Sequence, residues 1–297
     1  MKKKLLLFLM ILVSLFMVVG CGKDDDDDDD EKSSKKVKEV KKEEEETKIS
    51  SKAKVEEKVL VDRDGVKVTL KSIDYNSYEV VFKLLVENNT SKTVTVQDDN
   101  VSINGLMVNS LFSATVAPGK KANDELSIMN EDLKIAKIKT IKDVELDLKA
   151  FDDETYDDIF VEKGIKFETD ATDYVQEYNT EGELVVDKNG VKIYALKVDD
   201  KDSFWGADIY FYIENNTGKQ IVVQAEDVSI NGFMVDDYFS TDLAPNKKAY
   251  DTMTFMEEDL KKNDIKSIDE LELKFKVWDY DTYDDVLKTE SIKVSFK

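Results

Sequence analysis

The chain contains a single thiol, on Cys21, and the residues before it indicate what that thiol does. Lysines occupy positions 2–4, and an almost unbroken apolar run follows at positions 5–19. A cationic start, a short apolar core and a small residue at the cut are typical of an export signal. The apolar run is shorter than the roughly 20 residues that a membrane-spanning helix needs. We therefore predict that residues 1–20 are a signal peptide, cleaved between Gly20 and Cys21.

The four residues Val18-Val19-Gly20-Cys21 resemble the lipobox of bacterial lipoproteins. This resemblance implies that the Cys21 thiol carries a diacylglycerol and that the protein is lipid-anchored at the cell membrane, on its extracytoplasmic face. Two acyl chains suffice for stable anchoring, whereas one is marginal. The alternative is an ordinary signal peptide followed by an incidental cysteine.

Clustered aspartates are the second group of residues that could carry chemistry. Carboxylates are the ligands that calcium prefers, but the spacing here lacks the glycine and the terminal glutamate of an EF-hand loop. We favour a solvated turn in which the aspartates cap backbone donors. We therefore predict no metal site and no cofactor. The aspartates are Asp152, Asp153, Asp157 and Asp158 in one loop and Asp279, Asp281, Asp284 and Asp285 in another.

Aromatic residues form the third group. Tyr210 and Tyr212 occupy outward positions of a predicted strand, and Trp205 and Tyr238 are expected nearby. Aromatics outside a core can form a platform for a glycan or peptide ligand. The alternative is that they support packing between strands or contact between domains.

The residue inventory argues against most catalytic machinery. The chain has no histidine, which removes the commonest general base and the usual zinc ligand. It has no glycine-rich phosphate loop. Its 43 basic and 65 acidic residues give a net charge of -22, which excludes the basic face that nucleic acid binding requires. We predict a protein that is not an enzyme.

Residues 21–57 carry the lipidated cysteine and then a dense mixture of charges, including seven consecutive aspartates at positions 24–30. Such a segment cannot bury enough apolar surface to fold. We predict a disordered stalk that lifts the folded part away from the membrane, rather than a cation site.

The remainder of the chain is an internal repeat. Most matching segments lie 127 positions apart; for example, residue 213 matches residue 86. The first pair of segments lies 125 positions apart. A period of this length indicates tandem domains rather than a solenoid. The matching segments are 64–67 with 189–192, 86–90 with 213–217, 101–105 with 228–232, 117–121 with 244–248, 131–133 with 258–260, and 151–158 with 278–285.

Each copy has the pattern of an all-β domain. Asp64-Gly65 and Asn189-Gly190 predict hairpin turns between β-branched runs. In the long strand predicted at residues 78–87, every second residue is apolar, and the matched positions of the second copy are apolar too. This agreement identifies the core face. We expect one short helix per copy at Glu131-Asp132-Leu133 and its match, then strands near 143–151, 159–168, 270–278 and 286–296.

Strands at this spacing predict two tandem immunoglobulin-like antiparallel β-sandwiches. We place the first at residues 58–169, a linker at 170–182 and the second at 183–297. The lipobox, the charged stalk and the repeated "ENNT", "VSING" and "TYDD" motifs resemble Gram-positive surface lipoproteins with tandem immunoglobulin-like repeats of largely unassigned function.

The resemblance implies a surface-exposed, non-enzymatic binding or interaction protein. Its expected contacts are the membrane, through the lipid, and a wall polymer, a protein or a host ligand. The alternatives are an extracytoplasmic enzyme or enzyme accessory that uses carboxylate chemistry, and a solute-binding transport lipoprotein.

Overall fold

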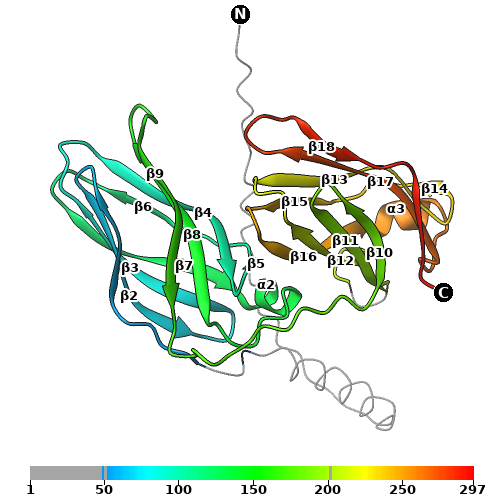
Figure 1. The fold of residues 1–297 in the computed structure, drawn as a ribbon, viewed down its shortest axis with the longest axis horizontal. Coiled ribbons are helices and arrows are strands. Elements are labelled where there is room, and N and C mark those ends of the chain that lie inside the picture. The colour runs from blue at the N-terminus through cyan, green and yellow to red at the C-terminus, as the bar shows by residue number, and fades with distance from the viewer. Residues whose placement is uncertain (1–48, 50–51, 201–202) are drawn as a thin grey trace, which may run out of the picture. The chain divides into compact units, whose positions relative to one another are not determined.

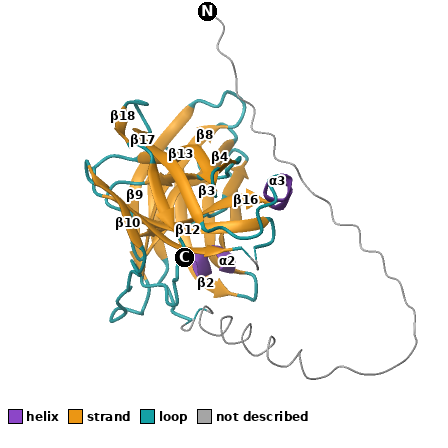
Figure 2. Ribbon diagram, turned by 90° about the vertical axis from the view of Figure 1, so that its right-hand side faces the viewer, coloured by secondary structure: helices purple, strands orange, loops and turns teal. Residues whose placement is uncertain are grey.

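The computed structural model describes residue 49 and residues 52–200 and 203–297. The signal peptide, Gly20, Cys21 and most of the predicted stalk lie outside the described residues. Within them the chain forms antiparallel sheets and two short helices, so the all-β prediction is confirmed (Figure 2). Each repeat is a β-sandwich, with its strands in two layers (Figure 1).

In the first repeat one sheet has the strand order β1-β2-β3-β7, and the other contains β4, β8 and β9 with the short β5 and β6 beside β4. Strands β2 and β3 shift register at Leu70 through a bulge. The elements are β1 (Lys58–Arg63), β2 (Val66–Tyr75), β3 (Glu79–Asn88), β4 (Val94–Ile103), β5 (Leu106–Met107), β6 (Ser113–Val116), β7 (Lys121–Met129), α2 (Asn130–Ile135), β8 (Asp143–Asp152) and β9 (Asp158–Glu168).

The second repeat has the same arrangement, with sheets β10-β11-β12-β16 and β14-β13-β17-β18, where β15 also pairs with β13 and β19 with β17. The elements are β10 (Glu183–Lys188), β11 (Val191–Asp199), β12 (Gly206–Asn215), β13 (Ile221–Ile230), β14 (Phe233–Met234), β15 (Ser240–Leu243), β16 (Lys248–Met256), α3 (Glu257–Lys262), β17 (Glu270–Asp279), β18 (Asp285–Lys288) and β19 (Ile292–Ser295).

The predicted core faces are confirmed. Every second residue of β3 and of β12 is buried between the two sheets of its own repeat. Burying one such side chain contributes about 1.5–3 kcal/mol. The residues are Val80, Phe82, Leu84 and Val86 in the first repeat and Ala207, Ile209, Phe211 and Ile213 in the second.

The predicted hairpin turns follow from backbone sterics. Asp64 and Gly65 both have positive φ, at 52° and 82°, and Asn189 and Gly190 have 54° and 82°. Two successive residues with positive φ suit the right-handed twist of the flanking strands, and Asp-Gly and Asn-Gly reach that conformation most easily. The two turns therefore set the register of β1 on β2 and of β10 on β11.

The "ENNT" motif builds a buried polar bracket. The Asn88 side-chain amide donates to the carbonyls of Lys92 and Val116, both at 2.8 Å, and its oxygen accepts from the Thr90 amide at 2.9 Å and hydroxyl at 2.7 Å. Asn215 makes the matching contacts in the second repeat. A buried amide must have such partners, because leaving one unsatisfied costs about 1–3 kcal/mol.

Two boundaries differ from the sequence predictions. The strand expected near 286–296 is divided into β18 and β19, because the Thr289 hydroxyl accepts the Phe275 amide in place of a ladder carbonyl. The stalk was predicted to extend to residue 57, yet residues 52–57 lie against the first repeat, with Ala53 only 4% exposed.

Candidate functional site

An exposed aromatic group lies at one end of the second repeat. Phe204 is 87% exposed, and Trp205 and Tyr238 are each 59% exposed. The Phe204 and Trp205 rings meet edge to face with centroids 4.9 Å apart. The Trp205 carbonyl accepts the Glu257 amide at 2.8 Å, which fixes the chain just before β12. We call Phe204, Trp205 and Tyr238 the aromatic patch.

Backbone pairing places Tyr238 at the same end of the sheet. Tyr238 and Thr254 form an isolated antiparallel bridge, and Thr254 is in register with Asp208 of β12, three residues after Trp205. Directly opposed residues of antiparallel strands share one face, so Tyr238 stands beside the outward side of β12.

The first repeat exposes apolar residues at the matched positions. Tyr78, which matches Trp205, is 77% exposed, and Leu111, which matches Tyr238, is 66% exposed. Their backbones are held identically, by a hydrogen bond from the Asn130 amide to the Tyr78 carbonyl at 2.8 Å and by a bridge between Leu111 and Ser127. The sequence analysis did not identify Phe204, Tyr78 or Leu111. Alignment of the two repeats contains a signal for two of them, because it pairs Tyr78 with Trp205 and Leu111 with Tyr238.

Tyr210 and Tyr212, the other two residues predicted for a ligand platform, are not part of the exposed aromatic patch. Tyr210 is half-buried, and the Lys197 ammonium lies over its ring, 4.6 Å from the centroid. Tyr212 is fully buried and belongs to the core cluster of the first repeat, although it is carried by β12 of the second. Tyr212 therefore serves the contact between the repeats, which was the alternative role predicted for these aromatics.

This contact centres on a row of tyrosines. Tyr194, Tyr212 and Tyr250 are in register across β11, β12 and β16, and the Tyr212 ring centroid lies 5.9 Å from that of Tyr194 and 4.9 Å from that of Tyr250. Tyr178 of the linker lies beside them, with its ring centroid 6.3 Å from that of Tyr212, and its hydroxyl donates to the Asn104 carbonyl of the first repeat at 3.0 Å. We call these four residues the tyrosine joint.

Polar contacts complete the joint. Asn100 and Gln220 exchange two amide hydrogen bonds, at 3.2 and 3.0 Å, and Lys247 forms an ion pair with Glu145. The Lys248 amide donates to the Gly105 carbonyl at 3.0 Å, so that β16 continues the sheet of β5. The described residues of the two repeats accordingly form one compact unit.

A polar hollow of about 640 Å³ lies beside this contact. Three of its four acidic side chains are engaged, and Glu145 is the one that pairs with Lys247. Asp147 accepts the Gly164 amide at 2.7 Å and the Asn100 side chain at 3.0 Å, and Asp279 pairs with Lys219 at 2.7 Å. The hollow is therefore a structural seam rather than a set of groups poised for chemistry.

The aspartate loops are organised as turns. Asp152 is buried, accepts the Glu154 amide at 3.0 Å and pairs with Lys92 at 2.6 Å, and Asp279 repeats this pattern with Asp281 and Lys219. The hydrogen bond from the lysine holds the pKa of each buried carboxyl below its usual range. Among the described residues no group of three or more acidic side chains is arranged to hold a metal ion.

Asp237 differs from these acids because burial raises its pKa to about 6. In the first repeat the matched position is Ser110, whose hydroxyl donates to Asp98 on the facing strand β4. The residue of the second repeat that matches Asp98 is Ala225. Between the repeats the carboxyl has thus moved from strand β4 to the loop before β15, and it has lost the hydroxyl that donated to it.

No family model and no curated protein matches the chain. Among solved structures it is similar to a conserved domain protein from Bacillus anthracis, with 14% identity over 84% of this chain and 95% of that chain and a TM-score of 0.28. It is also similar to the YadV chaperone (11% identity, 72% and 91% of the chains, TM-score 0.22) and to a protein of unknown function from Porphyromonas gingivalis W83 (13%, 78% and 99%, 0.20). Scores this low carry no functional argument.

Proposed function

We propose that the chain is a lipid-anchored, non-enzymatic binding protein on the extracytoplasmic face of the cell membrane, where it presents two immunoglobulin-like domains to a wall polymer, a protein or a host ligand. The observation that carries the binding role is the pair of exposed apolar positions kept in both repeats, Tyr78 with Leu111 and Trp205 with Tyr238. A contiguous exposed apolar patch marks an interaction site, and in the second repeat the Phe204 and Trp205 rings are in direct contact.

The physical reason is the free energy that these side chains release when they are covered. An aromatic side chain buries about 150–250 Å² when it is enclosed, at about 25 cal/mol per Å². The tyrosine joint supports the proposal further, because it holds the exposed positions of both repeats on one compact unit.

The binding role can be tested with a single-tryptophan reporter. Trp205 and Trp278 are the two tryptophans of the chain, and the Trp278→Phe variant leaves Trp205 as the only one. We expect its emission to shift to shorter wavelength when solubilised wall fragments or surface proteins that contain the ligand are added. Trp205→Ala and Tyr78→Ala should each weaken capture of the ligand in a pull-down.

The matched control for these variants is Tyr283→Asn. Tyr283 is 79% exposed but lies in the aspartate loop, and its φ of 62° is one that asparagine tolerates. If Tyr283→Asn reduces capture of the ligand as much as Trp205→Ala does, the aromatic patch has no specific role in binding.

The anchor is tested separately. Cys21→Ala should abolish incorporation of radiolabelled palmitate. Labelling that persists in this variant would refute lipid attachment at Cys21. For the part of the chain that the structure describes, no helix is both long and apolar enough to cross a bilayer.

A further inference from the structure

The stretch that precedes β1 is packed onto the first sandwich. The Tyr75 hydroxyl donates to the Ala53 carbonyl at 2.9 Å. The Lys54 amide donates to the Asp170 carboxylate at 2.7 Å, and the Asp170 amide donates back to the Lys54 carbonyl at 2.9 Å. Because Tyr75 ends β2 and Asp170 follows β9, residues 52–57 close the gap between the ends of the two sheets. We call residues 52–57 the lead-in.

The matching stretch of the second repeat takes a different course. Tyr178, which matches Ala53, donates its hydroxyl to Asn104 of the first repeat. Asn179 matches Lys54. Its backbone amide donates to the Tyr250 hydroxyl at 2.6 Å, and its carbonyl accepts from the same hydroxyl at 3.1 Å. The second lead-in is therefore consumed by the tyrosine joint and does not cover its own sandwich.

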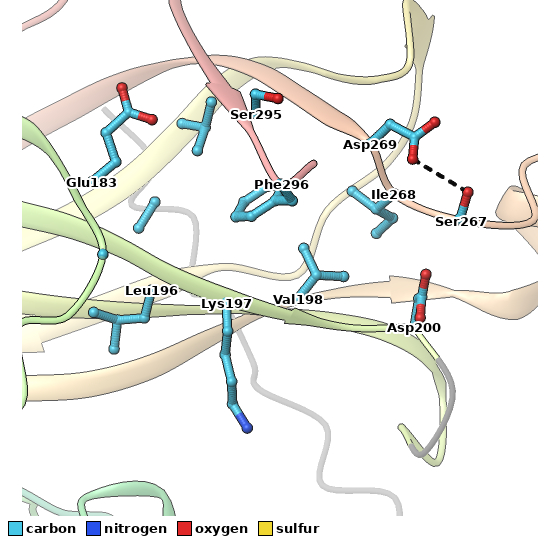
Figure 3. Close-up of a pocket in the computed structure, with 13 residues that line it drawn as sticks. Glu183, Leu196, Lys197, Val198, Asp200, Ser267, Ile268, Asp269, Ser295 and Phe296 are labelled. Carbon is cyan, nitrogen blue, oxygen red and sulfur yellow. Dashed lines mark hydrogen bonds between the residues drawn. The ribbon is translucent and has the colours of Figure 1, made fainter.

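A groove of about 580 Å³ occupies the place that the lead-in fills in the first repeat. Val198, Ile268 and Phe296 meet at its centre, whereas Lys197 extends away from them (Figure 3). Val198 matches Ile73, and Asp200 matches Tyr75, the residue that binds the lead-in of the first repeat. The groove thus occupies the matched place in the fold without a lead-in, and it has Asp200 and Lys297 where Tyr75 and Asp170 bind the lead-in of the first repeat.

We propose that this groove binds an extended peptide segment of a partner protein, with a small aliphatic side chain at the apolar centre and a lysine beside it. The first repeat supplies the precedent, because there the occupant is the segment Lys52-Ala53-Lys54-Val55, which contains no helix or turn and buries the small Ala53. Recognition of an extended peptide combines main-chain hydrogen bonds with pockets for alternate side chains.

The charges at the groove select the lysine. Asp200 stands where Tyr75 stands in the first repeat, so an acceptor replaces a donor. Asp269 is engaged by Lys297 at 2.9 Å, and the carboxylates of Glu183 and Asp200 supply negative charge at the two ends of the groove. An ammonium group near them gains a charge-assisted hydrogen bond.

The full chain in mild detergent should bind a fluorescent peptide of sequence Ser-Lys-Ala-Lys-Val-Glu, which copies residues 51–56, in a polarisation titration. We expect saturation below about 1 mM, since short peptides on preformed sites bind in this weak range. Replacing both lysines of the peptide by glutamate should weaken binding at least tenfold. No saturation with the lysine peptide would overturn the proposal.

Charge reversal in the protein locates the site. Glu183→Lys and Asp200→Lys should each weaken binding of the lysine peptide about tenfold, whereas Asp187→Lys, an equal charge change on the same strand β10 but outside the groove lining, should not. Equal weakening by all three would mean non-specific charge attraction and would refute the groove. Thermal melts verify that each variant is folded.

Two further measurements distinguish the groove from the aromatic patch and from a surface for self-association. Trp205→Ala should leave peptide affinity unchanged, because the groove does not depend on the aromatic patch; a loss of affinity in this variant would place the peptide on the patch instead. If the chain self-associates in sedimentation and the peptide disrupts that association, the occupant is a second copy of the chain, and the assignment to a partner protein is overturned.

Discussion

Truncating Tyr212 should uncouple the two repeats while leaving the residues between the two sheets of each sandwich in place. Its side chain points outward from β12, away from the sandwich of its own repeat, and it is nevertheless fully buried because the first repeat covers it. Tyr212→Ala therefore removes a buried aromatic ring from the tyrosine joint alone. Replacing a buried large aromatic by alanine costs about 3–5 kcal/mol, and each lost ring pair accounts for about 0.5–1.5 kcal/mol of such a figure.

The positions of the tryptophans make the uncoupling measurable. Both tryptophans, Trp205 and Trp278, lie in the second repeat, so their fluorescence follows that repeat only. Far-ultraviolet circular dichroism follows the strands of both repeats. In the unchanged chain we expect the two signals to give one coincident urea transition, because coincidence of probes is the sign of a single cooperative unit. In Tyr212→Ala the two midpoints should separate.

The matched control is Leu85→Ala, because Leu85 occupies the same outward position on β3 of the first repeat and is only half-buried. This change should cost about 1 kcal/mol or less and keep the two signals coincident. The reasoning is refuted if Tyr212→Ala loses less than about 1 kcal/mol and its signals still coincide.

Two other changes have defined outcomes. Because burial raises the pKa of Asp237 to about 6, its ionised form destabilises the folded state above that pH, and stability is regained as the pH falls from about 6 towards 4. Asp237→Asn should therefore raise the free energy of unfolding by about 1 kcal/mol at pH 7.5, after allowance for solvent screening, and leave it unchanged at pH 4. Urea unfolding at the two pH values measures this difference. An equal gain at both pH values would contradict a titration effect. Asn88→Ala leaves the Val116 carbonyl and the Thr90 amide without their partner, so it should lower the free energy of unfolding by about 2–4 kcal/mol. The control Asn109→Ala, at an exposed position, should lower it by less than about 1 kcal/mol in the same assay. Similar losses of stability in the two variants would contradict the polar bracket.

The repeat made most of each sandwich predictable. Agreement between the copies at every second position identified the core faces of β3 and β12, and Asp64-Gly65 and Asn189-Gly190 located the first hairpins. These features depend on neighbours close in the sequence, which a pattern can reveal. The division of β18 from β19 was not predictable in this way, because it depends on one side-chain hydroxyl, that of Thr289, accepting the Phe275 amide of the neighbouring strand β17, and periodicity does not reveal such a contact.

The candidate sites were less predictable, because contacts between the repeats decide them. An outward tyrosine such as Tyr212 has the pattern of a surface residue, and only the docking of the first repeat against it buries it. Residues 52–57 are rich in lysine and glutamate, which indicates a solvated chain, and the small apolar contribution of Ala53 and Val55 gives no periodicity. Trp205 and Tyr238 were identified, but their exposure had to come from the fold.

The lead-in should also be the first part of the described structure to yield when the chain is pulled from its N-terminal side. A pull from its N-terminal side would load the contacts of Ala53 and Lys54 before it reached the β1–β2 ladder. Each of those hydrogen bonds contributes only about 1 kcal/mol, so the lead-in should detach first and reversibly. At about 3.3 Å per residue its release adds roughly 20 Å of slack, which would absorb a sudden load before any strand of the sandwich is disturbed.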